Sequence, residues 1–151
     1  MYTIRQAHID DVPVLAMMGE KFYNYSAFNK YVPYDPESAA SKLAQLLLSG
    51  FLYVAEHDED GIIAGLAGTM TTLWFNGGLP VASELAWWVE EKHRKSPVGI
   101  RLYKAFEKWA FERGVKTIIM SDLVIEDQAP AEKLFKKMGF SIVERAHIKR
   151  G

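Results

Sequence analysis

The spacing of hydrophobic and polar positions changes repeatedly along the chain and predicts an alternation of strands and helices. Stretches that alternate at every second position, or are continuously apolar over a short length, predict strands. Stretches with apolar residues every three or four positions predict amphipathic helices. The expected strands cover 2–7, 51–57, 62–75, 82–90, 116–124 and 140–148. The expected helices cover 9–18, 36–49, 96–113 and 131–138.

This order, β-α-α-β-β-β-α-β-α-β, predicts an α/β domain with a mixed sheet of about six strands and about four helices. Parallel crossover connections are expected around the helix at 96–113. The segment that follows Phe22 is aromatic and interrupted by prolines, which predicts an irregular loop. The glycine-rich segment 76–80, "NGGLP", predicts a turn, and Trp74 and Phe75 before it are expected in the core.

Composition excludes several classes of protein. The chain has 151 residues, 49% hydrophobic and 25% charged, so one globular domain over residues 1–151 is expected. A net charge of −1 gives no general attraction to nucleic acid or anionic membranes, so neither is an expected partner. The absence of cysteine excludes disulfides, thiol nucleophiles and zinc–cysteine sites, and the 4 histidines lack ligand-like spacing, so no metal is expected. No signal-like or membrane-length apolar run is found, and we expect a cytoplasmic protein.

The turn before the third expected helix concentrates positive charge. His93, Arg94 and Lys95 precede Ser96 and Pro97, which suit the N-cap and the first helical position. One interpretation is therefore a well-formed helix start that follows a basic surface.

The other interpretation is an anion site, because a helix N-terminus offers free N–H groups and a partial positive charge. Gly99 lies in the first helical turn, where glycine is less favourable than alanine by roughly 0.5–1 kcal/mol. Close approach of a phosphate or pyrophosphate to the backbone would explain its presence. The chain has neither G-x-x-x-x-G-K-[ST] nor G-x-G-x-x-G, so we expect neither a nucleoside triphosphatase nor a dinucleotide oxidoreductase.

The stretch "WVEEKHRKSPVGIRL" resembles a degenerate form of the acetyl-coenzyme A motif of the GCN5-related N-acetyltransferase (GNAT) superfamily. That family commonly has V-x-P-x-x-R-G-x-G-x-G/A between its fourth strand and third helix. Val89, Arg94 and Gly99 match the valine, the arginine and the final glycine. The departures replace the proline and two glycines of the motif and are Glu91, Lys95 and Pro97.

A second stretch, "QAPAEKLFKKMGF", resembles the family's N-x-x-A-x-x-L-Y-x-K-x-G-F at its fourth helix. The matching positions are Ala131, Leu134, Lys137, Gly139 and Phe140. Gln128 stands at the asparagine position and Phe135 at the tyrosine position. Both motifs have the family's usual separation, and the predicted order of elements matches the family from end to end.

The resemblance implies a GNAT-like domain in which strands four and five splay apart and acetyl-coenzyme A is the co-substrate, with no metal. Pantetheine would pair with strand four, and the diphosphate would lie over the start of the third helix. The implied cofactor-binding residues are Trp87, Trp88, Val89, Arg94, Lys95, Ser96, Val98, Gly99, Ile100 and Gln128. Pro97 has no N–H to donate, so this departure and Lys95 bear on cofactor affinity rather than on the fold.

The implied reaction is direct attack of a primary amine on the thioester, and it requires a group that takes the amine proton. Glu84, in "ASELAWWV", resembles the glutamate that many members carry on strand four, and it is the expected catalytic base. Simple alternation places Glu84, Ala86 and Trp88 on one face of the strand. Burial of that face would raise the pKa of Glu84, whereas a water-facing Glu84 would be an ordinary strand residue.

Two further points follow from the resemblance. The family's usual acid is a tyrosine at the position of Phe135, and Tyr103 or a tyrosine of the 23–34 segment could replace it. The tyrosines of that segment could also form a wall of the acceptor site or simply pack on the sheet. The alternative to an enzyme is a binding module that holds coenzyme A or a macromolecular partner. The amine acceptor is not identified by any motif, and many relatives form homodimers, so that state is left open.

Overall fold

The computed structural model describes residues 1–123 and 131–151. Its helices and strands follow the predicted order up to the fourth helix. The strands are β1 (Tyr2–Gln6), β2 (Phe51–His57), β3 (Gly61–Leu73), β4 (Asn76–Val89) and β5 (Ile118–Ile119). The α-helices are α1 (Val12–Tyr25), α2 (Pro36–Ser49), α3 (Val98–Glu112) and α4 (Glu132–Lys137). Short 3₁₀ turns are η1 (Ile9–Asp11), η2 (Ala27–Lys30) and η3 (Glu91–His93).

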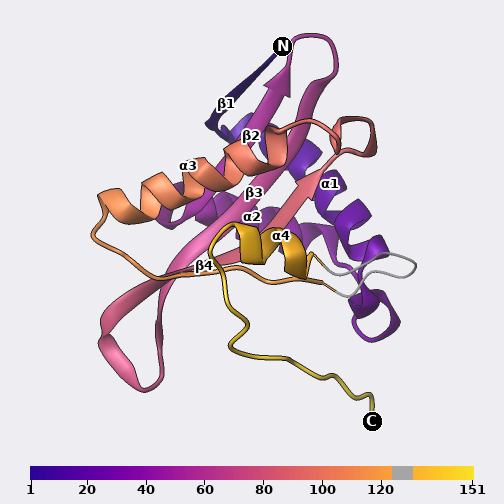
Figure 1. Ribbon diagram of the computed structural model, residues 1–151. Coiled ribbons are helices and arrows are strands. Elements are labelled where there is room, and N and C mark those ends of the chain that lie inside the picture. The colour runs from indigo at the N-terminus through magenta and orange to yellow at the C-terminus, as the bar shows by residue number, and fades with distance from the viewer. Residues whose placement is uncertain (124–130) are drawn as a thin grey trace.

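The sheet is mixed, as the sequence predicts, and its strands lie in the order β1-β2-β3-β4-β5. β1 to β4 are antiparallel neighbours, and the long β3–β4 hairpin projects from one end of the molecule (Figure 1). β5 runs parallel to β4, and the crossover between them contains α3. The predicted crossover around this helix is therefore confirmed.

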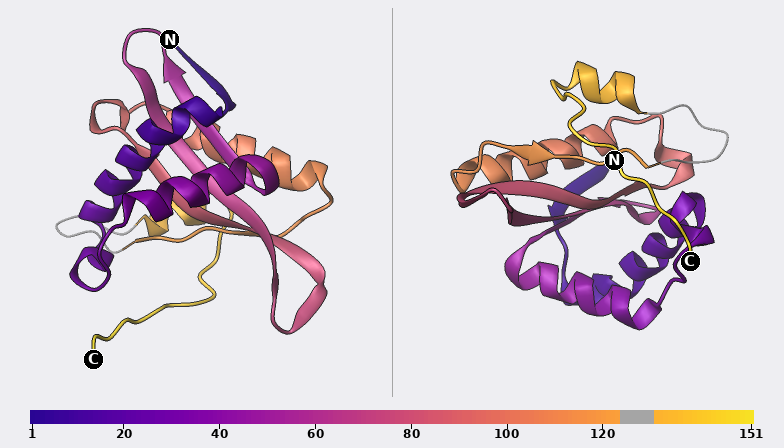
Figure 2. Two further views of the ribbon diagram at one scale, coloured as in Figure 1. Left: turned by 180° about the vertical axis from the view of Figure 1, so that it is seen from behind. Right: turned by 90° about the horizontal axis from the view of Figure 1, so that it is seen from below.

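Helices cover both faces of the sheet. α1 and α2 lie on one face, and α3 and α4 lie on the other (Figure 2). Apolar side chains fill each interface between helices and sheet. Leu102 and Phe106 of α3 are fully buried on one side, and Leu15 of α1 and Leu46 of α2 are buried on the other. None of the helices that the structure describes has the length and hydrophobicity that a membrane crossing requires.

The prediction of six strands is wrong for the described residues, which form a five-stranded sheet. The segment 140–148 is extended but pairs with no strand, and it leaves the body of the molecule (Figure 1). Val143 in this segment is 86% exposed. An alternating apolar stretch forms a strand only where a neighbouring strand pairs with it, and 140–148 has no such partner among the described residues. The strand expected over 116–124 pairs only at Ile118 and Ile119 within its described part.

The turn at the end of the β3–β4 hairpin lies earlier than predicted. Leu73 pairs with Asn76, so Trp74 and Phe75 form the turn, and the expected turn 76–80 belongs to β4. Asn76 Oδ1 accepts a hydrogen bond from the Gly78 N–H at 3.1 Å and stabilises an irregular stretch there. The expectation that the two aromatic residues belong to the core is also wrong, since Trp74 is 94% exposed.

α1 is longer than predicted and takes in part of the expected loop. It continues to Tyr25, and Ser26 ends it because its backbone turns to the extended region at φ −82° and ψ 154°. The Ser26 hydroxyl donates to the Tyr23 carbonyl at 2.8 Å, and the Ser26 N–H donates to the same carbonyl at 3.0 Å. The longer helix brings Tyr25 next to β4, which matters for the site.

Candidate active site

β4 contains an irregularity at Leu85 that sets the orientation of the predicted base. Ala67 of β3 pairs with Ala86, whereas the next residue, Gly68, pairs with Glu84. Leu85 is therefore an extra residue, a β-bulge in β4. A bulge reverses the alternation of side chains on either side of it.

The predicted face of Glu84 is consequently wrong. Ala86 and Trp88 pack in the core under α1 and α2, whereas Trp87 and Val89 pack in the core under α3. The bulge places Glu84 on the α3 side with Trp87 and Val89. Strict alternation failed because it cannot reveal an extra residue in one strand.

Glu84 is a buried carboxyl without a cationic partner among the described residues. It is 8% exposed, and its Oε2 accepts a hydrogen bond from the Ser121 N–H at 3.1 Å. Burial raises the pKa of Glu84 to about 7, and the Ser121 hydrogen bond opposes that rise only in part. A carboxyl with this pKa exchanges a proton readily at neutral pH.

The ladder between β4 and β5 is short and stops just before Glu84. It consists of Ala82 with Ile118 and Ser83 with Ile119. Beyond this point the Ser121 amide donates to the Glu84 side chain and not to a β4 carbonyl. The wider separation of the two strands remains a prediction.

The remainder of β4 has backbone groups on the side away from β3. The Glu90 N–H donates to the Ile63 carbonyl of β3 at 2.8 Å. By alternation, the N–H and C=O groups of Trp87 and Val89 point to the opposite side. There, the Val89 carbonyl accepts a hydrogen bond from Arg94 Nε at 2.9 Å.

The helix start that follows β4 differs slightly from the predicted one. α3 begins at Val98, two positions after the expected N-cap Ser96. The Ser96 hydroxyl donates to the His93 carbonyl at 2.7 Å and accepts only a long bond from the Val98 N–H at 3.4 Å. Within the described part of the chain, three backbone amides of this turn have no acceptor: those of Lys95, Gly99 and Ile100.

Gly99 faces protein rather than a ligand. A Cβ atom at this position would lie 3.3 Å from Val89 Cγ2 and 3.5 Å from Trp87 Cζ2. The glycine therefore allows the first turn of α3 to approach β4 closely. This contact explains the glycine without the ligand approach that the sequence suggested.

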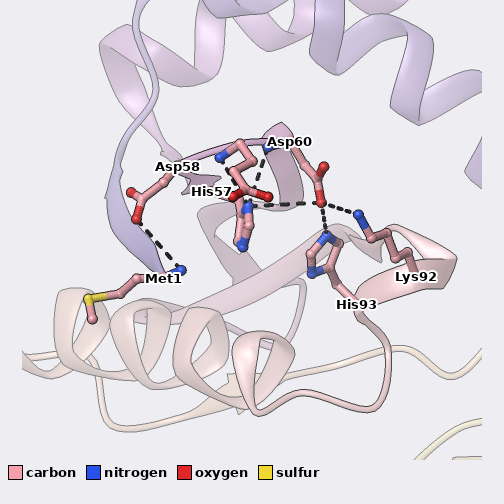
Figure 3. Close-up of polar contacts among 7 residues, drawn as sticks. Met1, His57, Asp58, Asp60, Lys92 and His93 are labelled. Atoms are coloured by element: carbon pink, nitrogen blue, oxygen red, sulfur yellow. Dashed lines mark hydrogen bonds and ion pairs between the residues drawn. The ribbon is translucent and has the colours of Figure 1, made fainter.

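Two side chains of the turn contact an acid from the β2–β3 hairpin. Lys92 Nζ and His93 Nε2 each lie 2.8 Å from Asp60 Oδ2 (Figure 3). Lys92, followed by His93, lowers the pKa of Asp60. The His57 ring, 5.1 Å from that of His93, accepts from the Asp60 N–H through Nδ1 at 3.3 Å. No group of three side chains suited to a metal occurs in the described residues.

Arg94 differs from those two neighbours because no acid pairs with it in the described part of the chain. Its guanidinium carbon lies 4.6 Å from the centroid of the Trp88 ring and 5.5 Å from that of Tyr25. Lys95 is exposed. Of the three basic residues expected in this turn, only Arg94 and Lys95 therefore have no acidic partner among the described residues.

The candidates for a general acid are limited. Phe135 packs near Trp87 and Phe140, with ring centroids 6.3 Å and 5.5 Å apart, and has no proton to donate. The Tyr103 hydroxyl already donates to Glu107 Oε2 at 2.6 Å. Burial, then this hydrogen bond, raises the pKa of Tyr103 well above its ordinary value, so Tyr103 does not suit the role. Gln128 lies outside the described residues.

A cavity of about 360 Å³ lies away from Glu84, between α1 and η3. Its lining includes Met17 and Ile63, and its rim includes Lys21 and Glu90, whose charged atoms are 2.9 Å apart. Glu84 is not part of this lining. We therefore place the candidate site at the β4 bulge, where a buried carboxyl lies beside the end of the β4–β5 ladder.

Sequence reasoning missed Ser121, Asp60 and Tyr25. Ser121 acts through its backbone amide, which has no side-chain signature. Asp60 belongs to the hairpin turn "DEDG", and nothing in that turn indicates contact with η3. Tyr25 is expected only as one of the 23–34 tyrosines that could form a wall of the acceptor site, replace the acid or pack on the sheet, and its contact with Arg94 has no sequence signature.

The family model of the Acetyltransferase (GNAT) family matches residues 19–140. The chain belongs to the GNAT acetyltransferase family. This match covers both quoted motifs and the whole candidate site, and the resemblance seen in the sequence is confirmed. No curated protein matches the chain in a sequence search.

Solved structures share the GNAT fold at low identity. One is a predicted acetyltransferase with acetyl-CoA from Clostridium acetobutylicum, with TM-score 0.76 and 16% identity over 99% of this chain and 96% of that one. Another is the ribosomal-protein-alanine N-acetyltransferase of Brucella melitensis biovar Abortus 2308, with TM-score 0.74 and 14% identity over 100% and 99%. A third is AAC(6')-Iy in complex with a CoA-linked bisubstrate analogue, with TM-score 0.75 and 15% identity over 100% and 98%.

Proposed function

We propose that the chain, acting as one GNAT domain, transfers an acetyl group from acetyl-coenzyme A to a primary amine by direct attack on the thioester. The observation that carries this proposal is Glu84, a buried carboxyl with a pKa of about 7 beside the end of the β4–β5 ladder. Family membership supports the reaction class, and Glu84 supplies the chemistry that the class requires.

Glu84 acts as the general base. A lysine-like amine has a pKa of about 10.4, so almost all of it is protonated at neutral pH and unable to attack. A base with a pKa near the working pH combines a useful ionised fraction with a useful affinity for the proton. The Ser121 N–H stabilises the deprotonated Glu84 side chain through Oε2, and this carboxylate takes the amine proton, directly or through water.

The residues around β4 and α3 fit coenzyme A. The acceptor-free amides of Lys95, Gly99 and Ile100 provide donors for a diphosphate, and Ser96 and Val98 border them. The outward backbone groups of Trp87 and the outward N–H of Val89 suit the amides of a pantetheine arm, whereas the Val89 carbonyl already accepts from Arg94. Acetyl-coenzyme A supplies the activated acetyl group. The acetyl-CoA in the Clostridium acetobutylicum structure and the bisubstrate analogue in AAC(6')-Iy support this choice of co-substrate.

Departure of coenzyme A does not require an acid from Phe135. A thiol has a pKa of about 8.5, so the thiolate is a tolerable leaving group at neutral pH. The acceptor is a small-molecule or protein amine. The exposed aromatic side chains of α1 and η2, among them Tyr25 and Phe28, are the proposed wall of the acceptor site.

A second candidate is a GNAT-fold binding module with little turnover. Phe135, Lys95 and Pro97 favour it, since one removes the usual acid and the others alter the anion-binding turn. The engaged Tyr103 hydroxyl removes one substitute acid. The enzyme and a module that holds coenzyme A both predict coenzyme A binding, and only the enzyme predicts thiol release in the presence of amines. A module that holds only a macromolecular partner predicts neither.

The test is calorimetry with acetyl-coenzyme A, followed by thiol release with a panel of primary amines. A thiol-reactive chromophore reports this release without background, because the chain has no cysteine. The proposal expects binding and amine-dependent release for at least one acceptor class. Binding without release across small amines, amino-terminal peptides and lysine peptides would favour the binding module. Absence of binding would exclude the enzyme and leave only a module that holds a macromolecular partner.

A further inference from the structure

The guanidinium of Arg94 is fixed on one edge and on one face. Its Nε donates to the Val89 carbonyl at 2.9 Å. Its face lies over the rings of Trp88 and Tyr25, with centroids 4.6 Å and 5.5 Å from the guanidinium carbon, distances typical of cation–π contacts. These contacts come from β4 and from the last residue of α1, two elements distant in the sequence.

The opposite edge of Arg94 is unused. Within the described part of the chain, neither Nη group has a protein acceptor, and Arg94 itself is exposed. Lys92 and His93, its neighbours in the sequence, both contact Asp60 Oδ2 (Figure 3). Arg94 is thus a cation with an oriented plane and two open donor groups, next to the acceptor-free amides of the α3 start.

An arginine side chain binds a phosphate best when its plane is fixed, because two parallel N–H groups must face two oxygens at once. A free arginine loses rotamer freedom when it binds, and a preoriented one loses less. The aromatic platform supplies this orientation. The Tyr25 hydroxyl has no hydrogen-bond partner among the described residues, so the ring alone makes the contact.

We propose that Tyr25 is a positioning residue that, with Trp88, holds Arg94 so that its Nη groups bind the diphosphate of the co-substrate. This inference rests on the proposed function and adds a residue from α1 to the cofactor site. It also links the aromatic wall beside the acceptor to the cofactor-binding turn through one side chain.

The test compares the affinity of each variant for coenzyme A with its affinity for acetylpantetheine, which has no diphosphate. Tyr25→Leu should weaken coenzyme A by about two- to fivefold, the size of one exposed cation–π contact, and leave acetylpantetheine unchanged. Tyr25→Phe keeps the ring and should bind both as the wild type does. Arg94→Gln should weaken coenzyme A by about tenfold or more, as expected for loss of charge-assisted hydrogen bonds.

The double variant gives the sharpest result. If Tyr25 acts through Arg94, adding Tyr25→Leu to Arg94→Gln should have no further effect on coenzyme A affinity. Phe111→Leu is the matched control, because Phe111 is an exposed aromatic residue in the last turn of α3 and has no contact with Arg94 in the described structure. It should leave both affinities unchanged.

Three outcomes would overturn the inference: no effect of Tyr25→Leu, equal weakening of both ligands, or additive effects in the double variant. Each leaves the proposed function intact, because the wild type still binds coenzyme A. A wild type that binds neither ligand would instead contradict the proposed function itself.

Discussion

Glu84 and Asp60 are two carboxyl groups with opposite surroundings. Glu84 is buried beside a single backbone donor, and burial raises its pKa to about 7. Asp60 lies on a hairpin turn against Lys92 and His93, and these partners lower its pKa. At neutral pH Asp60 is a fixed anion, whereas Glu84 is divided between its two protonation states.

The difference distinguishes a carboxylate that holds two segments together from a carboxyl group that can exchange a proton. Asp60 ties the β2–β3 hairpin to η3 and so holds the turn that precedes α3 (Figure 3). Glu84 lacks such a partner in the described residues, and its proton is therefore available for exchange. The predictions below test this division, beginning with the largest expected effect.

Replacement of Glu84 by glutamine should have the largest effect on activity. Glu84→Gln keeps the size of the side chain and removes the base, so turnover should fall by about 10²–10⁴-fold. Affinity for coenzyme A should be unchanged, because the proposed diphosphate donors belong to the turn and the first residues of α3, which follow β4 in the chain. Asp60→Asn is the matched control for loss of one carboxylate. If Glu84→Gln turns over as fast as the wild type, Glu84 is not the base.

The same replacement should stabilise the protein at alkaline pH. Because the pKa of Glu84 is about 7 in the folded chain and 4.5 when unperturbed, folding favours the protonated form. The protonated Glu84 therefore adds to the free energy of unfolding below pH 4.5. This contribution, about 3 kcal/mol, is lost as the pH rises through 7. Glu84→Gln should therefore unfold at higher urea than the wild type at pH 8 and at similar urea at pH 4. Equal stability at pH 8 would contradict the burial penalty.

Asp60→Asn should have a smaller effect with the opposite pH dependence. A lowered pKa means that Asp60 contributes stability above its ordinary pKa and loses it as the pH falls through the lower folded value. The variant should be slightly less stable than the wild type at pH 7 and similar at low pH. Because the group is exposed, 1 M salt should remove most of the difference in urea denaturation. A large, salt-insensitive loss would show that Asp60 does more than pair surface cations.

Much of the architecture could be predicted from the sequence, because hydrophobic periodicity reports local structure. The order of elements through α4, the end of α3 before Gly114 and the cap of α2 by Asp35 all follow from local patterns. The segment 140–148 alternates like a strand yet has no partner, and a sequence pattern cannot supply one.

The site was predictable by residue type but not by orientation. Glu84 could be identified as a candidate base from its resemblance to the family. Its face depends on the bulge at Leu85, which appears only when β4 is aligned with β3. The role of Gly99 likewise depends on how closely Val89 approaches it, and the platform under Arg94 depends on the length of α1.

The most direct test of the central claim is titration of the Glu84 carboxyl by carbon NMR, with its signal assigned by its absence in Glu84→Gln. The account predicts a midpoint near pH 7, matched by a rise of kcat/KM with pH over the same range. A midpoint near 4.5, the value of an unperturbed glutamate, would contradict it, because Glu84 would then be an ordinary anion with little tendency to take a proton from an amine.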